Sequence, residues 1–237
     1  MRARRMSILR AISVTLGLSL AAAAPALAQE VRPDQCTVVG FFEDVNELHA
    51  AVVAGSHNEK VLFQSSKDGG ACPSTNLKRC PRDRYLIPSN QVILNGETRK
   101  EFACAWYYSE GAHSELAGWI PKENLTQKDA AATTPKQWAG EWELMEDPKA
   151  ASFTMTIDGN RIEYTGDALS NLDSPMGPNT GNVSGAFSGT AKPPLTLNGG
   201  IPPCQLKLWL FEPFLVAEDN GSCGGMNVSF DGIYRKK

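Results

Sequence analysis

The chain has 237 residues, and its 23 basic and 26 acidic side chains give a formal net charge of −3. That balance excludes a broad basic surface of the kind that binds nucleic acid or anionic membranes without specificity. The length is sufficient for one large domain or two small ones.

The first element in chain order, residues 1–28, has the features of a secretory signal peptide. Four arginines precede a short apolar stretch, AISVTLGLSLAAAAPALA, which ends in a small-x-small cleavage site. The stretch is shorter than the roughly 20 residues of a membrane-spanning helix, and no cysteine for a lipid anchor follows it directly. We therefore expect cleavage before Gln29 and a periplasmic or secreted protein without a membrane anchor. Cleavage leaves 19 of the 23 basic residues against 26 acidic ones, a formal charge of −7.

All six cysteines lie after this leader. An even number of cysteines in an exported chain predicts three disulfide bonds. Zinc sites need closer cysteine pairs or histidines at matching spacing, so we expect neither a metal nor another cofactor. The last two cysteines have only each other as partners in their half of the chain, whereas the first four allow three pairings. The pairs that we favour are Cys36 with Cys104, Cys72 with Cys80, and Cys204 with Cys223.

Residues 29–126 contain short strand candidates separated by polar turns, among them KVLFQSS, RYLIP, NQVILNG, EFACAWYYS and AGWIPKENL. A VIL strand, a turn at Asn95–Gly96, an aromatic strand and a GW pair follow one another in an order that resembles bacterial SH3-like domains over residues 58–126. The resemblance implies a small antiparallel barrel. The four cysteines and the insert DGGACPSTNLKRCPRD depart from the usual form of the family. The residues that carry the resemblance are Trp106, Gly118, Trp119 and Leu125.

Aromatic side chains gather in this half of the chain. Trp106, Tyr107 and Tyr108 alternate in direction along one strand, so at least one of them should face outward. With neighbouring residues they could line a groove for a peptide or a glycan. The alternative is that Trp106 and Trp119 belong to the core of a small barrel. The predicted groove consists of Tyr85, Trp106, Tyr108, His113 and Trp119.

Residues 127–137 have the small, polar composition of an exposed linker. Residues 138–237 then contain a series of short strand candidates without helical periodicity. In SFTMTIDGNRIEYTG, two alternating runs flank Asp158–Gly159–Asn160, which predicts a tight hairpin. QLKLWLF, FLVAED and MNVSFDGIY are further candidates. The chain is therefore predicted to be all-β, with an SH3-like barrel followed by an up-and-down or sandwich-like antiparallel barrel.

The chain ends in EDNGSCGGMNVSFDGIYRKK, which places Cys223 in a glycine-rich turn between two strands. We interpret this stretch as a turn held by a disulfide bond. With the earlier W-x-G-x-W pattern, it resembles a C-terminal module of uncharacterised exported proteins of Gram-negative bacteria, which in some chains accompanies lysozyme-inhibitor-like segments. The resemblance implies a cell-envelope role. The residues that carry it are Trp138, Gly140, Trp142, Asp219, Asn220, Cys223, Gly224, Gly225, Asn227, Phe230 and Tyr234.

The sequence contains no familiar catalytic signature. It lacks a G-x-S-x-G elbow, an H-E-x-x-H motif, a phosphate loop and a dinucleotide fingerprint. The histidines His49, His57 and His113 are typical of loop or structural residues. Two carboxylate pairs could cleave glycans if folding brought them into opposition, but they are typical of outer-face and turn charges. These pairs are Glu141 with Glu143, and Glu218 with Asp219.

Residues 170–194, rich in glycine, serine and proline, predict a long exposed loop, which is uncommon unless functional or disordered. The alternative is an irregular strand over residues 183–187. We predict a non-catalytic binding protein whose partner is a cell-envelope peptide, glycan or protein. The alternatives are a glycan hydrolase and an inhibitor of a cell-wall hydrolase. In the inhibitor, Ser184, Phe187 and Ser188 would form the plugging loop.

Overall fold

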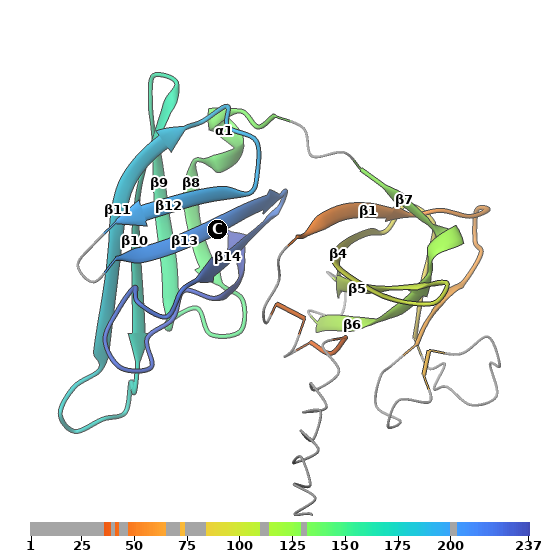
Figure 1. Ribbon diagram of the computed structural model, residues 1–237, viewed down its shortest axis with the longest axis horizontal. Coiled ribbons are helices and arrows are strands. Elements are labelled where there is room, and N and C mark those ends of the chain that lie inside the picture. Colours follow the sequence, from red (N-terminus) through yellow and green to blue (C-terminus); the bar gives the residue numbers. More distant parts are fainter. Residues whose placement is uncertain are drawn as a thin grey trace, which may run out of the picture. The chain divides into compact units, whose positions relative to one another are not determined.

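The described part of the chain is all-β, as predicted, and its strands form a five-stranded, a two-stranded and an eight-stranded sheet (Figure 1). The predicted signal peptide, Cys80 and His113 lie outside the described residues. The structure is a computed structural model that describes residues 36–38, 41–42, 47–64, 72–73, 84–109, 114–128, 132–199 and 203–237.

The five-stranded sheet belongs to the N-terminal half and is antiparallel, in the order β6-β5-β4-β1-β7. β2 and β3 pair separately, and Gln64, just after β2, bridges to Trp119 in β6. Apolar residues from both sheets, such as Val53, Phe63 and Ile120, share one buried cluster. The elements of this half are β1 (His49–Val53), β2 (Val61–Phe63), β3 (Arg84–Leu86), β4 (Gln91–Arg99), β5 (Phe102–Ser109), β6 (Ser114–Pro121), the 3₁₀ turn η1 (Lys122–Asn124) and β7 (Leu125–Gln127).

The predicted turn at Asn95–Gly96 is wrong, because both residues lie inside β4. The pairing register of β4 with β5 shifts between Leu94 and Thr98, so the regular ladder is interrupted within this stretch. Gly96 has a φ of +79°, a conformation that glycine adopts without steric cost. The buried side chain of Asn95 donates a hydrogen bond to the carbonyl of Phe41 (3.2 Å). Residues typical of a turn therefore interrupt the pairing of this strand without ending it.

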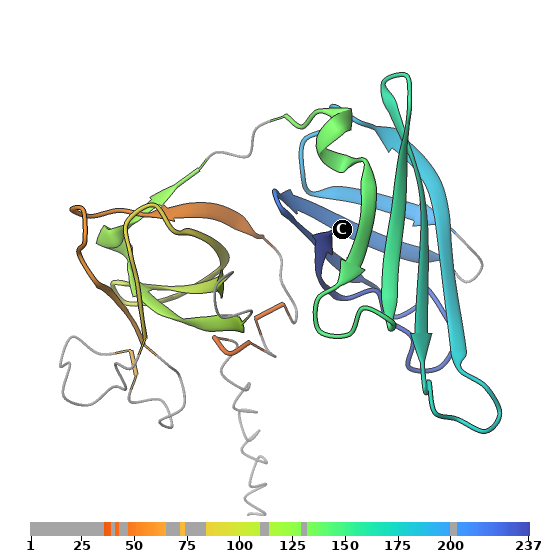
Figure 2. The same cartoon turned by 180° about the vertical axis from the view of Figure 1, so that it is seen from behind.

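The eight-stranded sheet has the order β11-β10-β9-β8-β15-β14-β13-β12 and is antiparallel. Its first strand in the sequence, β8, lies beside its last, β15, so the sheet curls into a nearly closed barrel (Figures 1 and 2). An antiparallel barrel in this half is what the strand pattern predicts. The elements are α1 (Pro135–Trp138), β8 (Gly140–Leu144), β9 (Ala151–Asp158), β10 (Arg161–Ser170), β11 (Asn179–Ser188), β12 (Leu195–Gly199), β13 (Cys204–Phe211), β14 (Phe214–Asp219) and β15 (Gly232–Lys236).

Period-two alternation decides which side chains fill this barrel. Phe153 and Met155 on β9 and Ile162 on β10 are buried in one cluster, while the residues between them are largely exposed. The predicted hairpin at residues 158–160 joins these two strands and is confirmed. Its Gly159 has a φ of +59°, which tight two-residue hairpin loops require.

A helical turn, α1, occupies the end of the predicted linker, where the sequence suggests an exposed connector. Residues 134–137 form a capping box with proline in the first turn. Trp138 is fully buried and packs edge-on against Phe187, with 5.0 Å between ring centroids. Its indole N–H donates to the hydroxyl of Thr133 (2.6 Å), which donates in turn to the carbonyl of Ala191 (2.7 Å). This part of the linker is therefore packed into the barrel.

The outer face of the barrel also carries apolar side chains. Trp209, Val216 and Ile233 are direct cross-strand neighbours on β13, β14 and β15, and all three are buried. They share one hydrophobic cluster with Ile93 and Trp106 of the N-terminal half. The described residues of both halves accordingly belong to one compact unit.

Two of the predicted disulfide bonds, Cys36–Cys104 and Cys204–Cys223, are confirmed. Cys72 is also disulfide-bonded, and none of the described cysteines is free. Such bonds fit an oxidising compartment. In the described ranges, the structure contains no helix with the length and apolar character needed to cross a membrane.

Replacing Cys204 and Cys223 together by alanine should lower the free energy of unfolding by about 3 kcal/mol. The bond joins residues 19 positions apart, so its loss increases the conformational freedom of the unfolded chain. Denaturant unfolding of the oxidised protein measures the change, with Ser222→Ala in the same loop as the control. An unchanged unfolding midpoint in the double variant would contradict this prediction.

Candidate functional site

The residues of the predicted aromatic groove have different surroundings. Trp106 and Trp119 are each 1% exposed and belong to the hydrophobic core. Tyr85 on β3 is 47% exposed. Tyr108 is half-buried and stacks on Trp106, with 6.5 Å between ring centroids, while His113 lies outside the described residues. The two tryptophans therefore offer no exposed surface, and the described groove residues that remain accessible are Tyr85 and Tyr108.

The segment predicted as an inhibitory loop is a strand. Ser184, Phe187 and Ser188 lie in β11, which pairs with β10 along its whole length. The ring of Phe187 packs against those of Trp138 and Tyr164. Glycines in β11 leave few side chains to show a period of two, which is why the sequence suggests a loop. The loop predicted over residues 170–194 is correspondingly shorter.

The first predicted carboxylate pair lies on the outer face of β8. Glu141 and Glu143 flank the buried Trp142. The ammonium group of Lys237 lies 3.6 Å from the carboxylate of Glu141 and 3.0 Å from that of Glu143. Exposed ion pairs of this kind contribute little to stability, and both carboxylates are paired with the same lysine.

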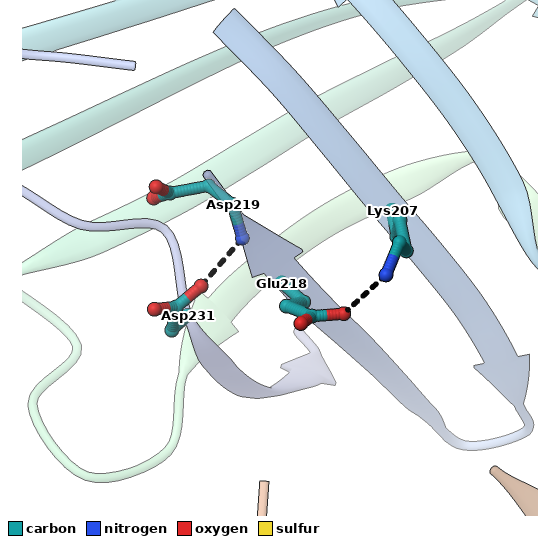
Figure 3. Close-up of polar contacts among 4 residues, drawn as sticks. All are labelled: Lys207, Glu218, Asp219 and Asp231. Atoms are coloured by element: carbon teal, nitrogen blue, oxygen red, sulfur yellow. Dashed lines mark hydrogen bonds and ion pairs between the residues drawn. The ribbon is translucent and has the colours of Figure 1, made fainter. Parts of the chain in front are cut away.

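The second predicted pair, Glu218 and Asp219, lies at the end of β14. Both carboxylates have structural partners, and Figure 3 shows the partner of Glu218. Glu218 forms an ion pair with Lys207 on β13 (3.1 Å). Asp219 closes the following loop, because its Oδ1 accepts from the N–H of Gly221 and its Oδ2 accepts from the N–H of Phe230, each at 2.5 Å. This side chain is therefore a loop clamp.

Asn220 fixes the same loop to the neighbouring strand. Its Oδ1 accepts from the N–H of Gln205 (3.1 Å) and of Ser222 (3.2 Å), and its Nδ2 donates to the carbonyl of Pro203 (3.0 Å). The Cys204–Cys223 bond joins the same two segments. Two side chains and a disulfide bond thus hold the glycine-rich turn.

Asp231 completes the group shown in Figure 3, and its Oδ1 accepts from the N–H of Asp219 (2.5 Å). Burial raises the pKa of Asp231 above its ordinary value, and the charges of Asp219 and Glu218 add to the shift, while hydrogen bonds to its carboxylate oppose it. In the described part of the chain, no group of three His, Cys, Asp or Glu side chains could hold a metal ion. The cluster supports the loop, and we assign it no chemistry.

The described large apolar side chain with the greatest exposure lies at the tip of the β10–β11 hairpin. Met176 is 94% exposed, and Leu172 on the same tip is also exposed. The tip projects beyond the neighbouring strand, because β10 pairs with β11 as far as Ser170 but with β9 only as far as Ala168. Figure 1 shows this extension below β10 and β11.

Two consecutive turns give the tip a defined backbone. The N–H of Ser174 donates to the carbonyl of Asn171, and the N–H of Gly177 donates to the carbonyl of Ser174, both at 2.9 Å. Pro175 and Pro178 restrict the backbone further. The tip therefore presents Met176 to solvent from a backbone with two hydrogen-bonded turns.

A second loop, residues 223–228, packs against the base of this hairpin. The carbonyl of Met226 accepts from the hydroxyl of Ser170 (3.0 Å) and from the side-chain amide of Asn179 (2.7 Å). The side chain of Met226 nevertheless remains 76% exposed. We define the apolar tip as the exposed residues Leu172, Met176 and Met226 on these two adjacent loops. Such an arrangement can bind an apolar surface, but it contains no catalytic group.

Comparison with known proteins adds no relative, because no family model, curated protein or solved structure matches the chain. The resemblances to SH3-like domains and to an exported Gram-negative module therefore stay predictions.

Asp231→Asn should raise the thermal midpoint by a few degrees near neutral pH. The raised pKa means that folding disfavours the ionised carboxylate, so a neutral amide removes a cost present above the folded-state pKa. The gain should disappear below the ordinary aspartate pKa of about 3.9, where Asp231 is protonated in both states. Thermal unfolding at about pH 7 and about pH 3 measures this, with the exposed Asp173→Asn as control. An equal gain at both pH values would refute the electrostatic cause.

Proposed function

We propose that the protein is exported, does not catalyse a reaction, and binds another protein of the cell envelope through the apolar tip. The disulfide bonds support export, since they form in oxidising compartments. Large exposed apolar side chains on adjacent loops can form a protein interaction site. The clamped carboxylates Glu218 and Asp219 argue against the glycan hydrolase alternative.

The observation that carries this proposal is the position of Met176, 94% exposed on a tip with a defined backbone. A side chain with so little packing contributes little to folding, so stability does not explain its presence. A loop whose backbone is restricted by two hydrogen-bonded turns loses less entropy on binding than an unrestricted loop. Methionine also adapts to irregular apolar pockets. The partner is therefore a protein with a concave apolar site.

The cleft of a cell-wall hydrolase is one such concave site, and the inhibitor hypothesis applies to the same tip. Ser184, Phe187 and Ser188 are less suited to enter a cleft, because they lie in a strand paired along its whole length. The tip projects beyond β9 and carries the exposed side chains. We therefore transfer the proposed inhibitory contact to residues 171–178.

We also propose that the N-terminal half is an SH3-like barrel. The antiparallel order of its sheet and the bridge between Gln64 and Trp119 support this fold. The glycine of the GW pair is required by packing, because a Cβ on Gly118 would lie 2.6 Å from the carbonyl of Gln64. Tyr85 and Tyr108 remain the proposed contacts of this half for a peptide or glycan.

Met176→Ser should weaken binding of the envelope partner more than tenfold. Burying a methionine side chain contributes roughly 1.5–3 kcal/mol, and about 1.4 kcal/mol corresponds to a factor of ten in affinity. The matched control is Ile157→Ser. Ile157 on β9 is 50% exposed and pairs with Ile162, at the end of β10 that lies far from the apolar tip. Its loss should leave the affinity unchanged.

Crosslinking of the oxidised protein to envelope proteins, followed by affinity measurements on the captured protein, tests this proposal. Equal affinities of the Met176→Ser and Ile157→Ser variants would contradict it. Turbidity of a cell-wall suspension distinguishes the alternatives. Clearing by the protein alone would identify a hydrolase and overturn the prediction that the protein does not catalyse a reaction. Protection of the walls against added lysozyme would support the inhibitor hypothesis.

A further inference from the structure

The apolar tip carries two of the four methionines that follow the predicted leader, and these two differ from the others in exposure. Met176 is 94% exposed and Met226 is 76% exposed. Met155 is 2% exposed in the core of the barrel, and Met145 is half-buried against a hydrophobic cluster. Solvent therefore reaches the two thioethers of the tip more freely than the other two.

The most reactive side chains that could compete with these thioethers for an oxidant are protected in the described part of the chain. Cysteine thiolates are the usual targets of oxidants, but none of the described cysteines is free. Tryptophan is another oxidisable side chain, and all five tryptophans are at most 2% exposed. An oxidant in solution therefore meets the thioethers of the tip first.

Oxidation of a thioether requires only a two-electron oxidant such as a peroxide. The sulfur attacks one oxygen of the peroxide, the O–O bond breaks, and a proton transfer releases the other oxygen as water. The sulfur gives two electrons to the peroxide and keeps one oxygen as a sulfoxide, which is polar and accepts hydrogen bonds. Methionine sulfoxide reductases restore the thioether, so the step is reversible.

The fold does not depend on the side chains of these two methionines. Met226 is held through its backbone carbonyl, which accepts hydrogen bonds from Ser170 and Asn179. The two turns around Met176 are also closed by backbone hydrogen bonds. Oxidation of both side chains should therefore change the surface of the tip and leave the barrel intact. A sulfoxide at Met155, in contrast, would place a polar group in the core.

We propose that Met176 and Met226 form an oxidation site, at which a peroxide makes the apolar tip polar while the fold is retained. The modified tip no longer suits an apolar pocket, because each sulfoxide would lose its hydration there. The effect on partner binding rests on the function proposed above, whereas the oxidation itself does not.

Peroxide treatment of the disulfide-bonded protein, followed by peptide mass spectrometry, tests the site. Met176 and Met226 should gain oxygen more than about tenfold faster than Met155, because a buried thioether reacts only after local opening of the structure. The thermal unfolding midpoint should stay unchanged while only these two residues are modified. Oxidation of Met155 at a similar rate, or a lower midpoint of the protein modified only at the tip, would overturn the proposal.

The matched control is the double variant Met176→Leu, Met226→Leu, because leucine keeps the apolar surface and the approximate volume but has no sulfur. Peroxide should reduce the retention of the wild-type protein on a hydrophobic matrix and leave that of the variant unchanged. This measurement needs no partner. An equal change in both proteins would contradict the proposal, because the effect would then arise outside the tip.

Binding to the captured envelope protein tests the consequence of oxidation. The oxidised wild-type protein should bind more than about tenfold more weakly than the untreated protein, and methionine sulfoxide reductases should restore the affinity. The leucine variant should bind equally before and after treatment. Undiminished binding of the oxidised wild-type protein would refute the loss of binding. Absence of binding by the untreated protein would instead refute the proposed function, while mass spectrometry and retention still decide the oxidation site.

Discussion

The pairing of β15 with β8 is the contact on which the C-terminal half depends. It places the last strand of the chain beside the first strand of the barrel, with Tyr234 opposite Leu144. The backbone N–H of Lys237 extends the contact by donating to the carbonyl of Glu141 (2.9 Å). Tyr234 is fully buried, and its hydroxyl donates to the carbonyl of Phe230 (2.8 Å). The strand that closes the barrel therefore also contributes a buried side chain to its core.

The apolar tip depends on a series of contacts that starts at this closure. The Cys204–Cys223 bond and the clamp residues Asp219 and Asn220 hold the loop between β14 and β15. That loop then packs on the hairpin base so closely that a Cβ on Gly181 would lie 2.9 Å from the carbonyl of Cys223. The disulfide-bonded, glycine-rich turn thus helps to position the proposed interaction surface.

Features encoded by local pattern could be predicted from the sequence, while those decided by packing could not. Alternation predicts the strands of the barrel, and the 158–160 turn follows from its residue types. α1 escapes prediction because four residues are too few to show helical periodicity, and Trp138 anchors it only once the barrel exists. The pairing of β8 with β15 joins distant segments and leaves no local signal. At the candidate site, the exposure of residues 170–178 could be predicted from their glycine-, serine- and proline-rich composition. The position of Met226 beside them could not, because it depends on a contact between two loops that are distant in the sequence.

The sheet leaves β11 and β12 as its terminal strands, so among the described strands each has one edge without a partner. The β11 edge is covered near one end, where the N–H of Gly225 donates a hydrogen bond to the carbonyl of Thr180 (3.1 Å). Just past the other end of β11, the hydroxyl of Thr133 donates a hydrogen bond to the carbonyl of Ala191. Long free edges invite strand pairing between molecules and fibrous assembly. By shortening the accessible stretch of this edge, the covering loop should disfavour strand pairing between molecules.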